Sequence, residues 1–308
     1  MKAVNGVTFA LRRGTILALV GESGCGKTVT ALSVLRLLPY PGRIIDGEVF
    51  FDGRDMTLLS KEEMRQIRGQ EISMIFQDPL SGLNPVLPVG SQVEEIITSH
   101  LPVSRKEARR HALQVMAEAR LTNAAEIFNR YPFQLSGGMG QRVMIAIAMA
   151  LRPKVLIADE PTSALDVTIQ AQILEEIRVL KETLGSAVIL ITHDMGVVAQ
   201  IADEVAVMYA GSIVEQADTV TLFRRPAHPY TAALLQSLPR VDAVDRRLRP
   251  IRGAPPSLVD LPDECPFLPR CDRGTNQCRT SPMPPLEPAE SGHLAACYHR
   301  IRYDWAQD

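Results

Sequence analysis

The sequence contains no apolar run that approaches the ~20 residues needed to span a membrane as a helix. Its longest apolar run, residues 143–151, is better explained as a buried helix. The N-terminus also lacks the charged, apolar and small-residue segments of a secretory signal in their usual order. These absences lead us to expect a cytosolic chain.

An excess of charge of either sign is also absent, since the formal net charge is −2. The overall charge therefore gives no electrostatic reason to expect nucleic acid as the main partner. Hydrophobic residues make up 46% of the chain and charged residues 22%, as is usual for a soluble globular protein. A chain of 308 residues can form one large α/β domain and a smaller one.

The chain has only five cysteines, and in a cytosolic protein we expect them to be reduced, metal-bound or catalytic rather than disulfide-bonded. Four of them, Cys265, Cys271, Cys278 and Cys297, follow the spacing C-x5-C-x6-C-x18-C. Four thiolates can hold Zn²⁺ or an iron–sulfur cluster, and the lack of short C-x(2–4)-C pairs favours the cluster. The nearby His293 and His299 are interpreted as surface residues.

Strands and helices alternate up to residue 216, which predicts an α/β fold with a mostly parallel sheet. Strand-like runs occur at residues 4–9, 15–20, 48–52, 72–76, 155–158, 187–192 and 204–209. Helical patterns occur at residues 29–38, 61–68, 169–184 and 228–238, and Gly185 ends the third. Residues 84–151 form an inserted helical block, in which Ser104 and Glu107 make a capping box. Residues 240–288 have little apolar content, so we expect a metal or cluster to hold this tail.

The stretch Gly21-Glu-Ser-Gly-Cys-Gly-Lys-Thr28 fits G-x-x-x-x-G-K-[ST], a loop whose backbone N–H groups surround the phosphates of a nucleotide. It lies between an expected strand and an expected helix, whose positive N-terminal end would face the phosphates. Lys27 would bind the β- and γ-phosphates, and the Thr28 hydroxyl would bind Mg²⁺. The glycines would let the main chain approach the ligand, while Cys25 is expected to be only a small residue of the loop. The residues expected to bind the nucleotide here are Gly21, Ser23, Gly24, Cys25, Gly26, Lys27 and Thr28.

An apolar strand-like run ends in Asp159 and Glu160. This arrangement would place Asp159 near Mg²⁺ and Glu160 beside the attacking water as a candidate general base. In a chain that also has a phosphate loop, two acidic residues at a strand end point to nucleotide hydrolysis more than to solvated surface charges.

A second Gly-rich stretch, Leu135-Ser-Gly-Gly-Met-Gly-Gln-Arg142, precedes a helical pattern. Ser136 can cap that helix, and Gly137 and Gly138 leave its first amide groups bare. Such a helix start is a second anion site. A chain that binds one nucleotide would most simply use this second site on the nucleotide of a partner subunit.

The order of these motifs makes residues 1–216 similar to the ATP-binding subunits of ABC transporters. The resemblance implies that residues 21–28 are the Walker A loop, that Asp159 and Glu160 are Walker B with its catalytic Glu, and that residues 135–142 are the signature. It also implies that Gln77 contacts Mg²⁺, water and the membrane partner, that residues 163–166 with Asp166 are the D-loop, and that His193 is the switch histidine. The expected fold is a P-loop ATPase core at residues 1–83 and 152–225, a helical subdomain at 84–151 and a small Cys-rich C-terminal domain at 226–308.

Further stretches are similar to the dipeptide, oligopeptide and nickel branch of importers. Residues 77–85 resemble its extended Q-loop, and residues 228–231 and 253–257 resemble its C-terminal motifs. The four-cysteine spacing resembles its cysteine tail, which implies a [4Fe–4S] cluster. Two features depart from the family: Gly140 replaces a long polar or basic residue, and we expect the chain to begin after the family's first strand and its adenine-stacking aromatic residue.

The resemblance implies that two such subunits bind ATP and Mg²⁺ head to tail and hydrolyse ATP to drive import of di- or oligopeptides. The expected location is the cytoplasmic face of the cell membrane. The expected partners are two transmembrane permease subunits, a second ABC ATPase that is a paralogue or a second copy, and indirectly an extracytoplasmic solute-binding protein, with no nucleic acid. Nickel, glutathione or another small solute stays open as cargo. A soluble ABC ATPase acting on ribosomes or DNA, and a redox-sensing regulator, are the alternatives.

Overall fold

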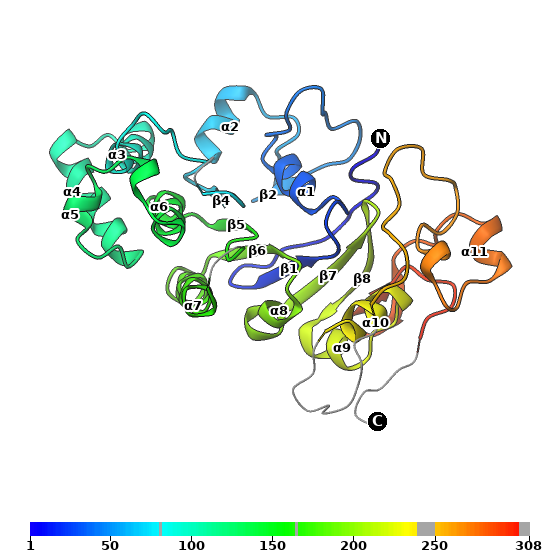
Figure 1. Ribbon diagram of the computed structural model, residues 1–308. Coiled ribbons are helices and arrows are strands. Elements are labelled where there is room, and N and C mark those ends of the chain that lie inside the picture. The colour runs from blue at the N-terminus through cyan, green and yellow to red at the C-terminus, as the bar shows by residue number, and fades with distance from the viewer. Residues whose placement is uncertain (80–81, 164–165, 239–249, 302–308) are drawn as a thin grey trace. The chain divides into compact units, whose positions relative to one another are not determined.

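The computed structural model of the protein describes residues 1–79, 82–163, 166–238 and 250–301 (Figure 1). The chain divides into two compact units. The first unit comprises residues 1–10, 16–32 and 191–308, and the second comprises residues 11–15 and 33–190. Within the described residues, no helix has both the length and the apolar character needed to cross a bilayer.

The strands of the first unit are β1 (Ile16–Val20), β7 (Glu204–Tyr209), β8 (Ser212–Asp218), β9 (Glu287–Glu290) and β10 (His293–Ala295). β1 pairs in parallel with β7, whereas β7, β8, β10 and β9 pair antiparallel in that order. The predicted strands at 15–20 and 204–209 are confirmed. The two predicted strands of this unit pair in parallel, as expected, whereas the antiparallel pairs involve β8, β10 and β9, which were not predicted. Ala210 and Gly211 have positive φ angles of 48° and 86° and turn the chain directly into β8.

The helices of the first unit include α8 (Met195–Ile201), α9 (Thr219–Arg224), α10 (Pro229–Gln236), the 3₁₀ turn η2 (Leu268–Arg270) and α11 (Asn276–Thr280). His228 caps α10 by accepting a hydrogen bond from Tyr230 N at Nδ1, 3.0 Å away. The helix predicted at 29–38 is α1 (Lys27–Val34), which starts at Lys27 and ends early. It ends early because Arg36 adopts a left-handed φ of 52°.

The predicted strand at residues 4–9 is wrong, since these described residues form no strand. Gly6 has a φ of 66° and interrupts the extended backbone. The segment still contacts the β7–β8 turn, because Asn5 N donates to Gly211 O at 2.7 Å and Ser212 Oγ donates to Asn5 O at 2.7 Å.

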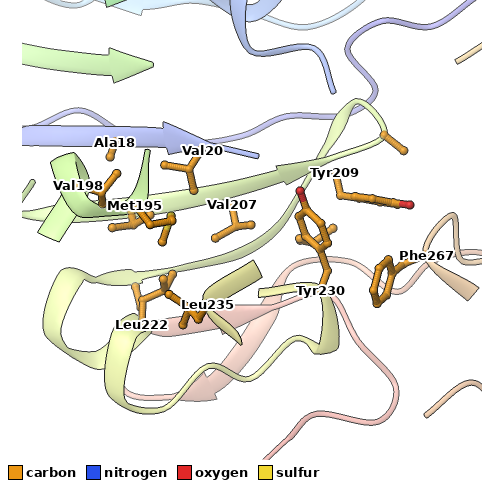
Figure 2. Packing of buried hydrophobic residues seen from close by; sticks show 14 residues of the cluster. Ala18, Val20, Met195, Val198, Val207, Tyr209, Leu222, Tyr230, Leu235 and Phe267 are labelled. Atoms are coloured by element: carbon orange, nitrogen blue, oxygen red, sulfur yellow. The ribbon is translucent and has the colours of Figure 1, made fainter. Parts of the chain in front are cut away.

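A residue of the C-terminal tail completes the core of the first unit (Figure 2). The ring centroid of Phe267 lies 5.3 Å from that of Tyr209 and 5.4 Å from that of Tyr230, both in edge-on geometry. Phe267 is 2% exposed and contributes to the same cluster as Val207 and Leu235. Residues 250–301 therefore add apolar contacts and two strands to this unit, so they do not depend on their cysteines alone.

The second unit contains β4 (Ile72–Ile75), β5 (Val155–Asp159) and most of β6 (Ala187–Thr192), in that spatial order. β4 and β5 are parallel, with Ile75 opposite Ala158. The strand predicted at 48–52 is observed as the short hairpin β2 (Phe50–Phe51) and β3 (Arg54–Asp55).

The helices of the second unit are α2 (Lys61–Ile67), α3 (Val89–His100), α4 (Arg105–Glu118), α5 (Ala124–Ile127), α6 (Gly137–Met149) and α7 (Val167–Leu184), with the 3₁₀ turn η1 (Pro132–Gln134). α3, α4 and α6 contact one another and form the helical block seen in Figure 1. The capping box of Ser104 and Glu107 is confirmed, since each side chain accepts from the other residue's backbone N–H. Gly185 ends α7 with a φ of 64°, as predicted.

Two glycines of the phosphate loop are required by the protein's own backbone. A Cβ on Gly21, where φ is 152°, would lie 2.2 Å from Met208 O of β7. A Cβ on Gly26, where φ is 106°, would lie 2.3 Å from Ala3 O. Around Gly24, by contrast, no described atom lies within 4 Å of a built Cβ. From the sequence, all three glycines were expected to let the main chain approach the ligand. In the structure, Gly21 and Gly26 are also needed because the loop packs closely against the backbone at Met208 and Ala3.

The substitution Gly21→Ala is expected to lower the free energy of unfolding by at least about 2 kcal/mol more than Gly6→Ala. Both positions have positive φ, but no described atom lies within 4 Å of a Cβ on Gly6, so that control measures backbone strain alone. Urea unfolding of both variants tests this. Equal losses would contradict the role of Met208 O.

The substitution Phe267→Ala is expected to destabilise the protein by about 3–5 kcal/mol, because it opens a cavity beside Tyr209 and Tyr230. Phe133→Ala is the control, since Phe133 is 74% exposed and its loss should change stability by less than about 0.5 kcal/mol. Denaturant unfolding of the two variants gives the comparison. Similar small changes in both would show that the tail does not share the core.

Candidate functional site

The phosphate loop of the first unit connects β1 to α1 and presents polar groups at the surface. Ser23, Gly24 and Thr28 are exposed, whereas Lys27 is 6% exposed. Lys27 Nζ donates to Gly21 O at 2.7 Å and to Glu22 O at 3.0 Å. The Lys27 ammonium group therefore bridges two carbonyl groups of its own loop. These bonds hold its positive charge on the inner side of the loop.

Cys25 lies beside that lysine as a buried thiol. Its Sγ is 3.7 Å from Lys27 Nζ. Burial raises the pKa of the Cys25 thiol, and the nearby Lys27 charge only partly opposes this effect. A protonated, buried thiol is a poor nucleophile. The geometry agrees with the interpretation of Cys25 as a small residue of the loop.

The second unit brings Gln77 and Glu160 together. Gln77 follows β4 and Glu160 follows β5, and because these neighbouring strands are parallel, both residues lie at the same sheet edge. Gln77 Nε2 donates to Glu160 Oε2 at 3.4 Å. Asp159, the last residue of β5, is 1% exposed. Glu160 has a φ of 45°, a left-handed conformation that a non-glycine residue adopts at an energetic cost and that is frequent at functional sites.

The start of α6 has the expected capping arrangement. Ser136 is the N-cap residue, and its Oγ accepts from Met139 N at 3.4 Å. A Cβ on Gly138 would lie 3.0 Å from Ile169 Cδ1 of α7, while no described atom lies within 4 Å of a Cβ on Gly137. The first turn of α6 therefore has an open side at Gly137.

The contacts of two α6 residues were not found from the sequence. Gln141 Nε2, which is buried, donates to Pro161 O at 2.8 Å and connects α6 to the residue after Glu160. Arg142 donates to Glu176 Oε1 at 3.2 Å and to Gln172 Oε1 at 2.5 Å on α7. Burial raises the pKa of Glu176. The Gln141 bond joins α6 to the segment directly after the acidic pair, and the Arg142 bonds join α6 to α7.

Asp166 is the N-cap of α7, where its Oδ1 accepts from Thr168 N and Ile169 N at 3.0 Å each. Ser163 N donates to Glu160 O at 3.1 Å. The other two residues of the predicted D-loop, Ala164 and Leu165, lie outside the described residues, as do Leu80 and Ser81 of the stretch 77–85. In the structure Asp166 thus has a capping role, and its predicted role at a nucleotide stays a prediction.

His193 follows β6 and is exposed. The next residue, Asp194, caps α8 by accepting from Gly196 N at 2.8 Å. The sequence interpretation did not include this helix. His193 and the phosphate loop belong to the first unit, and Gln77, Glu160 and Ser136 belong to the second.

The four clustered cysteines line one pocket of the first unit, together with His228, Phe267 and His299. Burial raises the pKa values of the Cys265 and Cys271 thiols and raises that of Cys297 to about 11. The other three cysteines add to the shift at Cys297, so the four thiols interact with one another. Among the described residues, no group of three or more His, Cys, Asp or Glu side chains is arranged to hold a metal ion.

The interpretation of His293 as a surface residue is wrong. His293 is 2% exposed, and its Nε2 lies 2.7 Å from Oε1 of the fully buried Glu215. Glu215 also accepts from Ala227 N at 2.7 Å and from His228 N at 2.8 Å. Burial lowers the pKa of His228 to about 4. The error arose because neither β8 nor β10, which bring Glu215 and His293 together, was predicted.

Two protein-family models match the chain. A model described as ABC transporter matches residues 4–163. A model described as oligopeptide/dipeptide transporter, C-terminal region, matches residues 214–278. The second match covers most of β8, all of α10 and three of the four clustered cysteines.

Curated relatives are similar over nearly the whole chain. A dipeptide transport ATP-binding protein of Bacillus subtilis is 50% identical over 88% of this chain and 81% of its own length. An oligopeptide transport ATP-binding protein of the same organism is 46% identical over 96% and 90%. An oligopeptide transport ATP-binding protein of Salmonella typhimurium is 45% identical over 97% and 88%.

Among solved structures, a dimeric bacterial ABC transporter cassette has a TM-score of 0.64 and 30% identity, covering 70% of this chain and 90% of that one. A related dimer in a post-hydrolysis state with ADP and phosphate has a TM-score of 0.64 and 29% identity over the same shares. Together with the motif geometry, these matches establish a P-loop α/β ATPase fold. The chain belongs to the ATP-binding subunits of ABC transporters, in the oligopeptide/dipeptide transporter family.

Proposed function

We propose that this chain hydrolyses ATP to power the import of di- or oligopeptides through an ABC transporter complex. The observation that carries the proposal is the match of residues 214–278 to the oligopeptide/dipeptide transporter C-terminal region. Relatives that are 45–50% identical are dipeptide and oligopeptide transport ATP-binding proteins, which supports the same cargo class. The presence of both Glu160, a candidate general base, and His193 supports hydrolysis rather than binding alone.

In this proposal, the chain binds one MgATP. Lys27 binds the β- and γ-phosphates, and the backbone amides from Gly21 to Thr28 surround them. Thr28, Gln77 and Asp159 would hold Mg²⁺, and their hydroxyl, amide and carboxylate oxygens are the ligands that this ion prefers. Bound Mg²⁺ neutralises charge on the phosphates during hydrolysis.

The attacking water is activated by Glu160 as general base, and Gln77 and His193 orient it. The 3.4 Å contact between Gln77 and Glu160 supports a shared water between them, since a water could replace this long hydrogen bond with two shorter ones. Hydrolysis would then change the contacts of Gln77. Gln77 lies between β4 and α3, so it would report the state of the γ-phosphate to the helical block.

A second ATPase subunit completes each nucleotide site. Ser136, Gly137 and Gly138 of one subunit would bind the γ-phosphate held by the other, with Asp166 between the two sites. The open side of α6 at Gly137 supports this role, because backbone N–H groups there can reach a ligand. The second subunit is a paralogue or a second copy of this chain.

The remaining partners in the proposal are two transmembrane permease subunits, with an extracytoplasmic solute-binding protein acting indirectly. The chain would lie peripherally on the cytoplasmic face of the cell membrane, and the helical block α3–α6 would contact the permeases. Nickel, glutathione or another small solute is the alternative cargo. A soluble ABC ATPase of non-transport function has less support, because the C-terminal match is to a transporter region.

We further propose that Cys265, Cys271, Cys278 and Cys297 hold a [4Fe–4S] cluster, with Zn²⁺ as the alternative. The four thiols line one pocket, which supports a shared ligand. A tetrahedral Zn²⁺ with bonds of about 2.3 Å would bring the sulfurs roughly 3.8 Å apart. In the part of the chain that the structure describes, no group of three or more His, Cys, Asp or Glu side chains is placed to hold a metal ion, so the preference for the cluster over Zn²⁺ rests on the cysteine spacing, which lacks short C-x(2–4)-C pairs. A bound cluster would supply crosslinking of the tail and redox sensitivity, and ATP hydrolysis itself needs only the nucleotide-site residues.

The substitution Glu160→Gln is expected to abolish steady-state phosphate release while MgATP still binds, so that an ATP-bound dimer accumulates. Phosphate release, size-exclusion chromatography with MgATP and uptake of a radiolabelled tripeptide by cells carrying the variant are the measurements. Glu182→Gln is the control, because Glu182 is an exposed residue of α7 paired with Arg178. Normal hydrolysis by the Glu160 variant would remove this residue from its role.

Protein purified without oxygen is expected to be brown and to contain about four iron and about four sulfide ions per chain, as one [4Fe–4S] cluster requires. Cys278→Ser should lose the colour, and Cys25→Ser should keep it because Cys25 lies in the phosphate loop. Visible absorption and elemental analysis test this. A colourless preparation with one zinc per chain would favour the alternative.

A further inference from the structure

The phosphate loop contains a negative charge that its function does not explain. Glu22 lies directly after Gly21, in the loop that binds the triphosphate in this family. A carboxylate close to a triphosphate repels it, and this repulsion is strong where water is partly excluded. The Glu22 side chain is 24% exposed, so water screens it only in part.

The charge of Glu22 is neutralised by Arg270 from the C-terminal tail. Arg270 donates through one terminal nitrogen to Glu22 Oε2 at 2.5 Å and through the other to Glu22 Oε1 at 2.9 Å. This two-point geometry fixes the carboxylate's orientation as well as its charge. The Arg270 side chain is 4% exposed. The hydrogen bond from Arg270 to Glu22 raises the pKa of the guanidinium, so Arg270 keeps its charge at all physiological pH values.

Arg270 is itself held by surrounding groups. Its Nε donates to Arg252 O at 2.7 Å, and its terminal nitrogens reach Gly253 O at 3.4 Å and the Tyr209 hydroxyl at 3.3 Å. On the loop side, Glu22 N donates to the Tyr230 hydroxyl at 2.9 Å. Both the backbone and the side chain of Glu22 are therefore fixed by residues outside the loop.

The position of Arg270 in the chain connects this contact to the cysteines. Arg270 is the last residue of η2 and directly precedes Cys271. Phe267 directly precedes the first residue of η2. Phe267 packs on Tyr209 and Tyr230, the two residues whose hydroxyls contact Arg270 and Glu22. A displacement of residues 265–278 would thus move the guanidinium away from Glu22.

We propose that Arg270 is a positioning residue for the phosphate loop, which neutralises and orients Glu22 so that the loop accepts MgATP only while residues 265–278 are in place. The proposal rests on the nucleotide binding of the family and adds a residue from the C-terminal tail to the nucleotide site. Arg270 acts through Glu22 and does not itself contact the phosphates.

A purely structural pair would only fasten the tail to the loop. That reading predicts that removing either partner lowers stability without a specific effect on the nucleotide. The proposed electrostatic role predicts something different: the defect of an Arg270 variant comes from the uncompensated Glu22 carboxylate, so removing that carboxylate as well should restore binding.

The test measures the affinity of the full-length chain for Mg²⁺ and a non-hydrolysable ATP analogue by calorimetry. Arg270→Gln is expected to weaken binding about tenfold, as loss of a charge-assisted hydrogen bond does. The double variant Arg270→Gln/Glu22→Gln is expected to bind within about threefold of the unmodified chain. Raising the salt concentration should recover part of the binding of Arg270→Gln, because salt screens the partly exposed Glu22 carboxylate.

Arg225→Gln is the matched control, since Arg225 pairs with Glu290 at 2.8 Å and joins the end of α9 to β9. It should leave the affinity unchanged. If Arg270→Gln does not fold, Arg270→Lys keeps the charge without the two-point geometry and should weaken binding by a smaller factor. Unchanged affinity in a folded Arg270 variant, or a double variant as weak as Arg270→Gln, would overturn the proposal. Failure of the unmodified chain to bind the analogue would instead contradict the nucleotide site itself.

Discussion

The close contact between the phosphate loop and the backbone of β7 is the constraint on which the nucleotide site depends. Met208 O occupies the space that a side chain at position 21 would need, and Ala3 O does the same at position 26. Lys27 then bridges the loop carbonyls from inside. The protein's own backbone therefore shapes the loop, and donors held in place bind an anion at a smaller cost in conformational entropy.

In the second unit, the register of two parallel strands positions the candidate site residues. Because β4 and β5 are parallel and Ile75 lies opposite Ala158, the residues that follow the two strands meet at one edge. Gln77 and Glu160 contact each other there. Gln141 of α6 donates a hydrogen bond to the carbonyl of Pro161, the residue that follows Glu160. One buried hydrogen bond therefore joins the segment after the acidic pair to the first turns of α6.

Local features could be predicted from the sequence, and contacts between distant segments could not. The cap at Ser136, the capping box at Ser104 and the stop at Gly185 each depend on residues within four positions, and all three are observed. The pair Glu22–Arg270 joins residues 248 positions apart. Likewise, the buried partner of His293 became visible only with β8 and β10. Motif order predicted the candidate site residues, but the groups that hold them had no local signal.

Isolation of this chain from gently solubilised native membranes, followed by identification of its partners, tests the account most directly. The account predicts two integral membrane proteins and a second ABC ATPase in fixed proportion, with an associated solute-binding protein that binds peptides. Recovery with ribosomes or DNA-associated proteins, and without integral membrane proteins, would contradict the proposed role in peptide import.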